Sequence, residues 1–270
     1  MSFDFFRQIV EQVPGLREIK LQGLGEPLLT PDLSAMLEWG KKKGVRFDLI
    51  TNGHLPFDRY PPVLPFLSRL AVSLDAVTAE TAEKLRSSIN LERLKDTIRH
   101  LVEEKRRQGL ACTLGVNCVV SSINYREVSL LMKFAEEAGV DAANFVLGEN
   151  WKMPGEPGYE ESRSFVRDSL AKVGVEAIRN TYDEGGYRFQ LGLQDAAPRK
   201  GQCYWCFSSA FITCDGYVTP CCVRPNPEMI HFGNLKNASF REIWNGPNMR
   251  EFRLSHLRNH PNPVCDYCPR

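Results

Sequence analysis

Short apolar segments alternate with longer amphipathic segments along the first half of the chain. The short segments have the length of strands, and the longer ones repeat apolar residues at helical spacing. The predicted strands are Ile19–Gly23, Arg46–Thr51, Leu70–Asp75, Cys112–Val120 and Ala143–Leu147. The predicted helices are Pro31–Lys43, Thr78–Gln108 with a break near Ser87–Asn90, and Glu127–Ala138. This order of strand and helix predicts right-handed βαβ units and a parallel sheet.

The pattern changes after residue 148. Residues 148–200 are rich in Gly, Pro and Glu, and we predict a linker with one helix, Ser162–Val173, and a hairpin or strand near Tyr187–Leu193. Residues 200–270 are rich in Cys, Pro and Asn and have few periodic segments. Such a composition favours a loop-rich module held by a metal. We therefore expect an α/β core over 1–150, a bridging segment over 151–199 and a Cys-rich module over 200–270.

Charge and composition exclude several classes of protein. Lys and Arg total 34 against 33 Asp and Glu, and this balance argues against a nucleic-acid-binding protein. No apolar run approaches the roughly 20 residues of a membrane helix. The amino-terminal residues lack the basic stretch and apolar core of a secretory signal. We therefore expect a cytoplasmic protein that binds neither nucleic acid nor membrane.

The nine cysteines are unevenly distributed. Cys112 and Cys118 lie in the apolar run ACTLGVNCVV, where free cysteine behaves as a small core residue. The other seven fall in the last quarter of the chain: Cys203, Cys206, Cys214, Cys221, Cys222, Cys265 and Cys268. A disulfide framework is not expected without an export signal, because reducing compartments keep thiols free. Clustered thiols at short spacings indicate a metal ion or an iron–sulfur cluster.

Glycine and polar residues follow the predicted strands at their carboxyl ends, which is where parallel α/β sheets bind ligands. These residues are Gly23, Gly25, Glu26, Asn52, Ser73, Asp75 and Asn117. Glycines let a ligand approach the backbone, and Glu26 can accept a hydrogen bond from an ammonium group. Turn formation and helix capping would also explain these residue types. Leu28 stands where a dinucleotide fingerprint has its third glycine, which disfavours a nicotinamide-binding fold.

The motifs LQGLGEPLL, LITNG and VSLDA together resemble the central part of the radical S-adenosylmethionine superfamily. The last seventy residues resemble its SPASM-type auxiliary cluster module. The matching pattern is Cys203, twelve residues, Gly216, four residues, Cys221, then Gly233-Asn234, Ile243-Trp244-Asn245 and Cys265-x-x-Cys268. The resemblance covers residues 5–150 and 200–270.

This resemblance implies a fold and a site. The fold is a partial (β/α)6 TIM-like barrel that lacks its first strand, joined to a small Cys-rich iron–sulfur module. Gly23, Gly25 and Glu26 would hold the methionine amino group of S-adenosyl-L-methionine. Ser73, Asp75 and Asn117 would contact its ribose or carboxylate, with Asn52 as a further contact.

The resemblance also implies a reaction. S-adenosylmethionine would be cleaved reductively to a 5′-deoxyadenosyl radical, which abstracts hydrogen from a small-molecule or peptide substrate. A flavodoxin or ferredoxin would supply the electron. The class of enzyme is therefore a radical S-adenosylmethionine oxidoreductase.

The superfamily's CxxxCxxC motif, which precedes the glycine-rich segment, is absent from this chain, since the first cysteine is Cys112. We therefore expect a chain truncated at its amino end and unable to generate the radical. Loss of the first strand would leave Ile19–Gly23 as an unpaired sheet edge, which favours aggregation. The alternative is a non-catalytic protein that binds peptides.

Soft thiolate ligands suit an iron–sulfur cluster or zinc. The expected ligands of one auxiliary 4Fe–4S cluster are Cys203, Cys221, Cys265 and Cys268. Cys222 adjoins Cys221 and points elsewhere in an extended segment, so either of the two could be the ligand. The rival is a zinc-ribbon-type scaffold, in which Cys203-x-x-Cys206 pairs with Cys265-x-x-Cys268 across a gap longer than the usual 15–20 residues.

Two histidines, His256 and His260, lie four residues apart in this region and could share one helix face. They could serve as ligands, but they sit among polar residues. We therefore expect both to be solvated.

Overall fold

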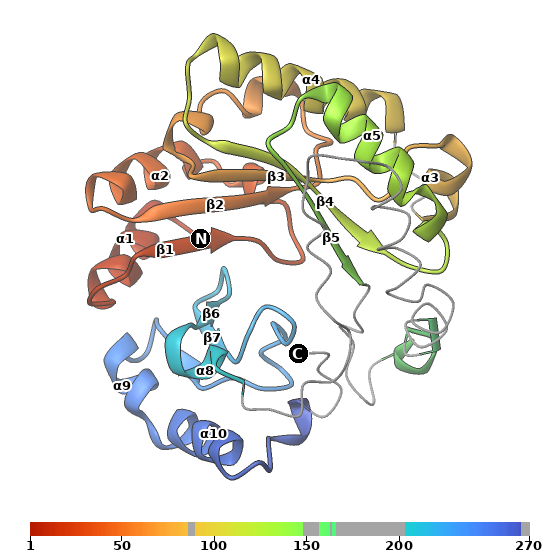
Figure 1. The fold of residues 1–270 in the computed structure, drawn as a ribbon. Helices are drawn as coiled ribbons and strands as arrows, with labels where there is room; N and C mark the ends of the chain where they lie inside the picture. The colour runs from red at the N-terminus through yellow and green to blue at the C-terminus, as the bar shows by residue number, and fades with distance from the viewer. Residues whose placement is uncertain (86–89, 148–156, 163, 166–202, 266–270) are drawn as a thin grey trace. The chain divides into compact units, whose positions relative to one another are not determined.

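A computed structural model describes residues 1–85, 90–147, 157–162, 164–165 and 203–265 (Figure 1). The chain divides into two compact units. The first, the sheet unit, comprises Glu18–Gly148 and Pro157–Ala196. The second, the Cys-rich unit, comprises Met1–Arg17, Glu149–Glu156 and Ala197–Arg270. The strand expected near Tyr187–Leu193 and most of the helix expected over Ser162–Val173 lie outside the described residues.

The sheet unit is built on five parallel strands in the order β1-β2-β3-β4-β5. Their bounds are β1 Glu18–Leu21, β2 Arg46–Thr51, β3 Arg69–Ser73, β4 Thr113–Val120 and β5 Ala142–Leu147. Because chain order and spatial order coincide, each connection crosses back over the sheet, as in a partial TIM-like barrel. The expected α/β class is therefore confirmed. Among the described strands, β1 pairs with β2 alone and forms one edge of the sheet.

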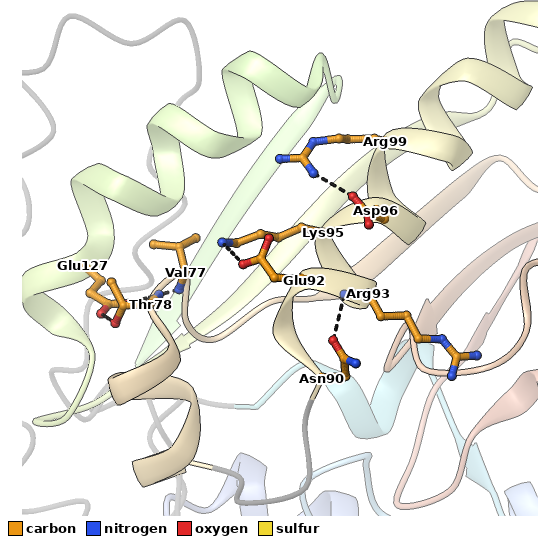
Figure 2. Close-up of polar contacts among 9 residues, drawn as sticks. All are labelled: Val77, Thr78, Asn90, Glu92, Arg93, Lys95, Asp96, Arg99 and Glu127. Atoms are coloured by element: carbon orange, nitrogen blue, oxygen red, sulfur yellow. Dashed lines mark hydrogen bonds and ion pairs between the residues drawn. The ribbon is translucent and has the colours of Figure 1, made fainter.

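Four α-helices connect the strands: α2 Leu33–Lys42, α3 Ala79–Leu85, α4 Leu91–Arg107 and α5 Val128–Ala138. Short 3-10 turns add η1 Pro27–Leu29, η2 Phe57–Arg59, η3 Leu64–Phe66 and η4 Tyr125–Glu127. Helix α3 is described to Leu85 and α4 begins at Leu91, with Asn90 in an extended conformation; the rest of the break predicted near Ser87–Asn90 lies outside the described residues. Asn90 begins α4 by accepting a hydrogen bond from the backbone N–H of Arg93 at 3.0 Å, as Figure 2 shows. This cap satisfies a donor that the helix itself leaves unpaired.

One face of the sheet is apolar and lies under α2, α4 and α5 (Figure 1). Strand residues on this face are fully buried, including Phe47, Leu70, Leu114 and Phe145. Helix residues such as Leu37, Ile98, Leu101 and Leu131 are buried with them. Burial of each such side chain contributes roughly 1.5–3 kcal/mol. Apolar packing therefore stabilises the sheet unit, and the other face of the sheet is left for polar residues.

The Cys-rich unit has much shorter elements. Three antiparallel strands, β6 Phe211–Ile212, β7 Tyr217–Thr219 and β8 Gly233–Asn234, form a small sheet. The helices are α1 Phe3–Gln12, α8 Trp205–Ser208, α9 Phe240–Asn245 and α10 Pro247–Leu257, and η5 spans Pro263–Cys265. Ser239 and Glu242 form a reciprocal capping box that begins α9.

The amino-terminal helix α1 packs within the Cys-rich unit. Ile9 lies in an apolar cluster with Val218, Leu235 and Ile243. The side-chain oxygen of Gln12 accepts a hydrogen bond from the backbone N–H of Phe240 at 2.8 Å. Residues 1–17 thus differ from the expected division of the chain, which placed them with the α/β core.

In the part of the chain that the structure describes, none of the helices combines the length and apolarity needed to span a bilayer.

Candidate functional site

The glycine-rich loop after β1 is organised by the Glu26 carboxylate. One oxygen accepts the Leu28 N–H at 3.2 Å and caps η1, and the other accepts the Asn52 N–H at 2.8 Å. Each oxygen keeps a further acceptor site. Leu24 is 83% exposed, and a Cβ added at Gly25 would meet nothing within 4 Å. Neither packing nor a positive φ requires glycine at 25, so the loop leaves open space next to a carboxylate.

Local backbone structure explains the residue types in the loop after β2. Asn52 accepts the His54 N–H at 2.9 Å with its side-chain oxygen, which forms an Asx turn. Gly53 has φ +75°, and a Cβ there would lie 2.3 Å from the Leu94 side chain. Glycine is therefore needed at 53 both for conformation and for space. Through its backbone N–H, Asn52 also ties this loop to Glu26.

Three polar side chains occupy one row across the sheet. Ser73 on β3 is the register partner of Asn117 on β4, and Asn117 is the partner of Asn144 on β5. Register partners in a parallel sheet project to the same face. The side-chain oxygen of Asn117 is buried and has no hydrogen-bond partner among the described residues. An unpaired buried acceptor costs about 1–3 kcal/mol, which suggests a ligand that supplies the missing donor. The sequence analysis missed Asn144, because only its strand register places it in the same row as Asn117.

Asp75 lies just beyond β3, and its carboxylate joins two strand ends. One oxygen accepts the Val119 N–H at 2.8 Å. Asn124, fully buried, donates to the Asp75 carbonyl at 2.7 Å and to the Val119 carbonyl at 2.9 Å. The Asn124 oxygen accepts the Ser121 N–H at 2.7 Å. Asp75 therefore has a clear structural role, and Asn124 is a residue that the sequence analysis missed.

Glu127 braces the segment between β3 and α3 (Figure 2). Its carboxylate accepts hydrogen bonds from the Val77 N–H at 2.9 Å and from the N–H and hydroxyl of Thr78. Burial by itself raises the pKa of Glu127, but hydrogen bonds from Thr78, Thr81 and Val77 outweigh burial and lower it. Glu127 is therefore a charged group held by donors, at the base of the Asp75 loop.

A cavity next to these strand ends is small. It is lined by Ser73, Asp75 and Ala76 on one side and by Ala82, Leu85, Leu91 and Leu94 on the other. Its volume of about 10 Å³ is close to the minimum for one water molecule. A nucleotide-sized ligand would therefore lie over the strand ends rather than inside this cavity.

Cys112 and Cys118 are core residues, as predicted. They are buried in the sheet unit, and burial raises the pKa of Cys112 to about 11 and that of Cys118 well above its ordinary value. Such thiols are unreactive and make poor metal ligands. None of the eight described cysteines forms a disulfide.

The Cys203–Cys206 segment is tied to α10. Cys206 is 1% exposed and packs against Met249 and Phe252. Burial, and to a lesser degree the charge of Cys203, raise the pKa of Cys206 to about 11, although the Arg253 charge acts to lower it. The Arg253 guanidinium donates to the Cys206 carbonyl at 2.8 Å. The Arg253 hydrogen bond therefore joins the Cys203–Cys206 segment to α10.

Arg224 brings the next two cysteine segments together. It is 4% exposed, and its backbone N–H donates to the Cys221 carbonyl at 3.2 Å in a tight turn. Its guanidinium Nε donates to the carbonyl of Val264, the residue before Cys265, at 2.8 Å. The segments around Cys221–Cys222 and Cys265 therefore converge.

His256 contacts the third segment. The prediction that it is solvated is wrong, because His256 on α10 is 6% exposed and its Nε2 lies 3.8 Å from the Cys265 Sγ. Burial lowers its pKa. The cause of the error is tertiary, since α10 presents this helix face to the cysteine loops. His260 is exposed, as predicted.

The expected four-ligand set is described only in part, because Cys268 lies outside the described residues. Within those residues, no three His, Cys, Asp or Glu side chains are grouped so that they could hold a metal ion. The assignment of Cys203, Cys221, Cys265 and Cys268 therefore stays a prediction. Its supporting observation is that buried Arg224 bonds to the backbone of both the Cys221 segment and the Val264–Cys265 segment, while buried His256 lies beside the Cys265 sulfur.

Comparisons with known proteins find similarity in both units of the chain. Residues 203–269 match the SPASM family, an iron–sulfur cluster-binding domain. The tungsten-containing aldehyde ferredoxin oxidoreductase cofactor-modifying protein of Pyrococcus furiosus is 25% identical over 291 residues, which cover 99% of this chain and 79% of that protein. The PqqA peptide cyclase of Gluconobacter oxydans is 24% identical over 263 residues, 93% of this chain and 70% of that protein.

The fold also matches a solved structure, that of Streptococcus suis SuiB. The TM-score is 0.69 at 13% identity, and the match covers 94% of this chain and 62% of that chain. SuiB has also been solved bound to S-adenosylmethionine and bound to its precursor peptide SuiA. This chain thus spans less than two thirds of SuiB, and at this identity the likeness shows the fold alone.

Proposed function

We propose that this chain is a radical S-adenosylmethionine protein with a C-terminal SPASM domain, and that its two units supply two parts of a peptide-modifying oxidoreductase. The strand ends of the sheet unit bind S-adenosylmethionine. The Cys-rich unit holds one auxiliary 4Fe–4S cluster. The observation that carries the proposal is the approach of spaced cysteine segments within residues that match an iron–sulfur cluster-binding domain.

The residues at the strand ends suit a sulfonium nucleotide. Glu26 keeps acceptor sites for the methionine ammonium group, and the open space at Gly25 admits its backbone. Asn117 offers an unpaired carbonyl to a ribose hydroxyl, with Ser73 beside it in the same row. Asn52 and Asp75 hold the loops that carry these groups. When bound beside a reducing cluster, S-adenosylmethionine supplies a 5′-deoxyadenosyl radical that abstracts hydrogen from the substrate.

The auxiliary cluster takes its ligands from three segments of the Cys-rich unit. Cys203 precedes α8, Cys221 or Cys222 lies in the Arg224 turn, and Cys265 ends η5, with Cys268 close behind it in sequence. Four thiolates are the usual ligand set of a 4Fe–4S cluster. Such a cluster would supply an electron acceptor for the substrate radical or an anchor for the substrate, and a flavodoxin or ferredoxin would serve as reductant.

A peptide is the substrate class we propose. PqqA peptide cyclase is named for a peptide, and SuiB has been solved with a precursor peptide. This polypeptide has no three-cysteine motif in residues 1–111, so we propose that it does not cleave S-adenosylmethionine unaided.

The test is anaerobic purification and reconstitution of the full chain, followed by iron, sulfide and zinc analysis. We expect four iron and four sulfide per chain, with no 5′-deoxyadenosine formed from S-adenosylmethionine under reducing conditions. Stoichiometric zinc without sulfide would replace the cluster with the zinc-ribbon alternative. Formation of 5′-deoxyadenosine would overturn the proposed inactivity.

A further inference from the structure

Helix α10 presents two nitrogen-bearing side chains, Arg253 and His256, to the cysteine segments. Arg253 donates to backbone carbonyls, those of Cys206 and Trp244, each at 2.8 Å. One turn later, His256 lies instead beside a sulfur atom, with its Nε2 3.8 Å from the Cys265 Sγ. Arg253 therefore holds backbone segments in place, whereas His256 contacts the side chain of an expected cluster ligand.

The surroundings of His256 fix its ring. The ring packs edge-on against Phe252 at 5.0 Å between centroids and is almost fully buried. Cys265 is half-buried and packs against the same apolar cluster, which contains Phe252 and Val264. A buried imidazole needs a hydrogen-bond partner, and the sulfur is the partner that the structure gives to Nε2. Sulfur accepts hydrogen bonds at longer distances than oxygen does, so 3.8 Å suits an N–H···S contact.

We propose that His256 is a positioning residue that donates its Nε2 hydrogen to the Cys265 thiolate and thereby raises the reduction potential of the auxiliary cluster. This inference rests on the proposed function, because it requires a cluster at Cys265. The role is distinct from ligation, since the expected ligands are four cysteines and His256 leaves all of them in place.

The direction of the effect follows from charge. One-electron reduction adds negative charge to the cluster and its thiolates, and an N–H donor next to a thiolate stabilises the reduced form more than the oxidised form. Hydrogen bonds to the sulfurs are an established means of setting cluster potentials. We expect removal of this one donor to shift the reduction equilibrium by about tenfold, which is ~59 mV for one electron.

The experiment compares three variants of the full reconstituted chain. His256→Phe keeps a buried ring and removes the donor, and His256→Gln keeps an amide N–H near the position of Nε2. His260→Gln is the matched control, because His260 lies four residues further along the chain and is exposed. Iron and sulfide content is measured first, and the midpoint potential is then measured by anaerobic titration followed by electron paramagnetic resonance.

We expect all three variants to hold the wild-type amount of iron. The midpoint potential should fall in His256→Phe by the ~59 mV that corresponds to a tenfold change in the one-electron reduction equilibrium. It should return toward the wild-type value in His256→Gln and stay unchanged in His260→Gln. A wild-type potential in His256→Phe would overturn the inference, as would loss of iron in both His256 variants, which would make His256 a ligand. A wild-type chain without iron and sulfide would instead overturn the proposed function.

Discussion

The two units of this chain are stabilised by different means. In the sheet unit, strands of four to eight residues bury apolar side chains beneath three helices. In the Cys-rich unit, the strands have two or three residues, and arginine side chains bonded to backbone carbonyls join its segments. From this comparison we expect apolar burial to suffice for the first unit. The described residues of the second unit form two small apolar clusters, and we expect this unit to need an additional cross-link, for which a cluster is the natural candidate.

The largest expected effect is that of iron removal. Apparent binding free energies of structural metal sites are on the order of 10 kcal/mol, so a chelator should unfold the Cys-rich unit. Hydrogen exchange followed by mass spectrometry should show loss of protection over residues 203–265 and, because α1 packs there, over residues 3–12. Strands β2, β3 and β4 should stay protected. Equal protection of residues 203–265 with and without iron would remove the proposed difference between the units.

Asn124→Leu should have the next largest effect, confined to the sheet unit. The substitution leaves the Asp75 and Val119 carbonyls and the Ser121 N–H without their partner in a buried site. We expect a loss of about 3 kcal/mol in the free energy of unfolding, measured by urea denaturation. A loss below about 0.5 kcal/mol would mean that this network does not hold the strand ends.

Glu127→Gln should cost about 1.5–2 kcal/mol at neutral pH, because a charged acceptor of several hydrogen bonds is replaced by a neutral one. The pKa of Glu127 is lowered in the folded chain, so its stabilising effect is fully present above the unfolded-state pKa near 4.5. The effect is lost as pH falls through the lower folded-state pKa. The difference between wild type and variant should therefore be constant from pH 7 to about pH 5 and shrink below that range. A difference that grows on acidification would contradict this role.

Asn117→Leu should have the smallest effect, with the opposite sign. Removing an unpaired buried acceptor should raise the free energy of unfolding by about 1 kcal/mol. S-adenosylmethionine should increase the thermal midpoint of the wild-type chain and not that of the variant. Asn124→Leu is the matched control, because it makes the same substitution at an asparagine whose side-chain amide is hydrogen-bonded within the protein. Destabilisation by Asn117→Leu would show that the amide has a structural role instead.

Much of the sheet unit follows from local sequence pattern. The strand at Arg46–Thr51 has the predicted bounds, and the break before α4 falls where Asn90 offers a cap. Apolar periodicity carries this information because one face of each element is buried against its neighbours. Of the residues expected at the strand ends, Ser73 and Asn117 lie within β3 and β4, and the others lie beyond their strands. The partners of Asp75 and Glu26 depend on contacts distant in sequence.

The Cys-rich unit was predictable in composition and not in detail. Cysteine spacing indicates a metal-dependent module, yet nothing local shows that Ile9 packs against Val218 or that α10 turns His256 toward Cys265. Short elements with few periodic positions give weak pattern signals, and tertiary contacts decide which side chains are buried. The same reasoning explains why His256 and His260, similar in sequence context, differ in exposure.

The most direct test is the iron content of single cysteine variants after anaerobic reconstitution. Cys203→Ala, Cys265→Ala and Cys268→Ala should each lose the 4Fe–4S cluster, as should one of Cys221→Ala and Cys222→Ala. Cys214→Ala should retain it, because Cys214 is exposed on the β6–β7 turn. Full iron and sulfide in Cys203→Ala and Cys265→Ala would contradict the convergence of these segments on one cluster.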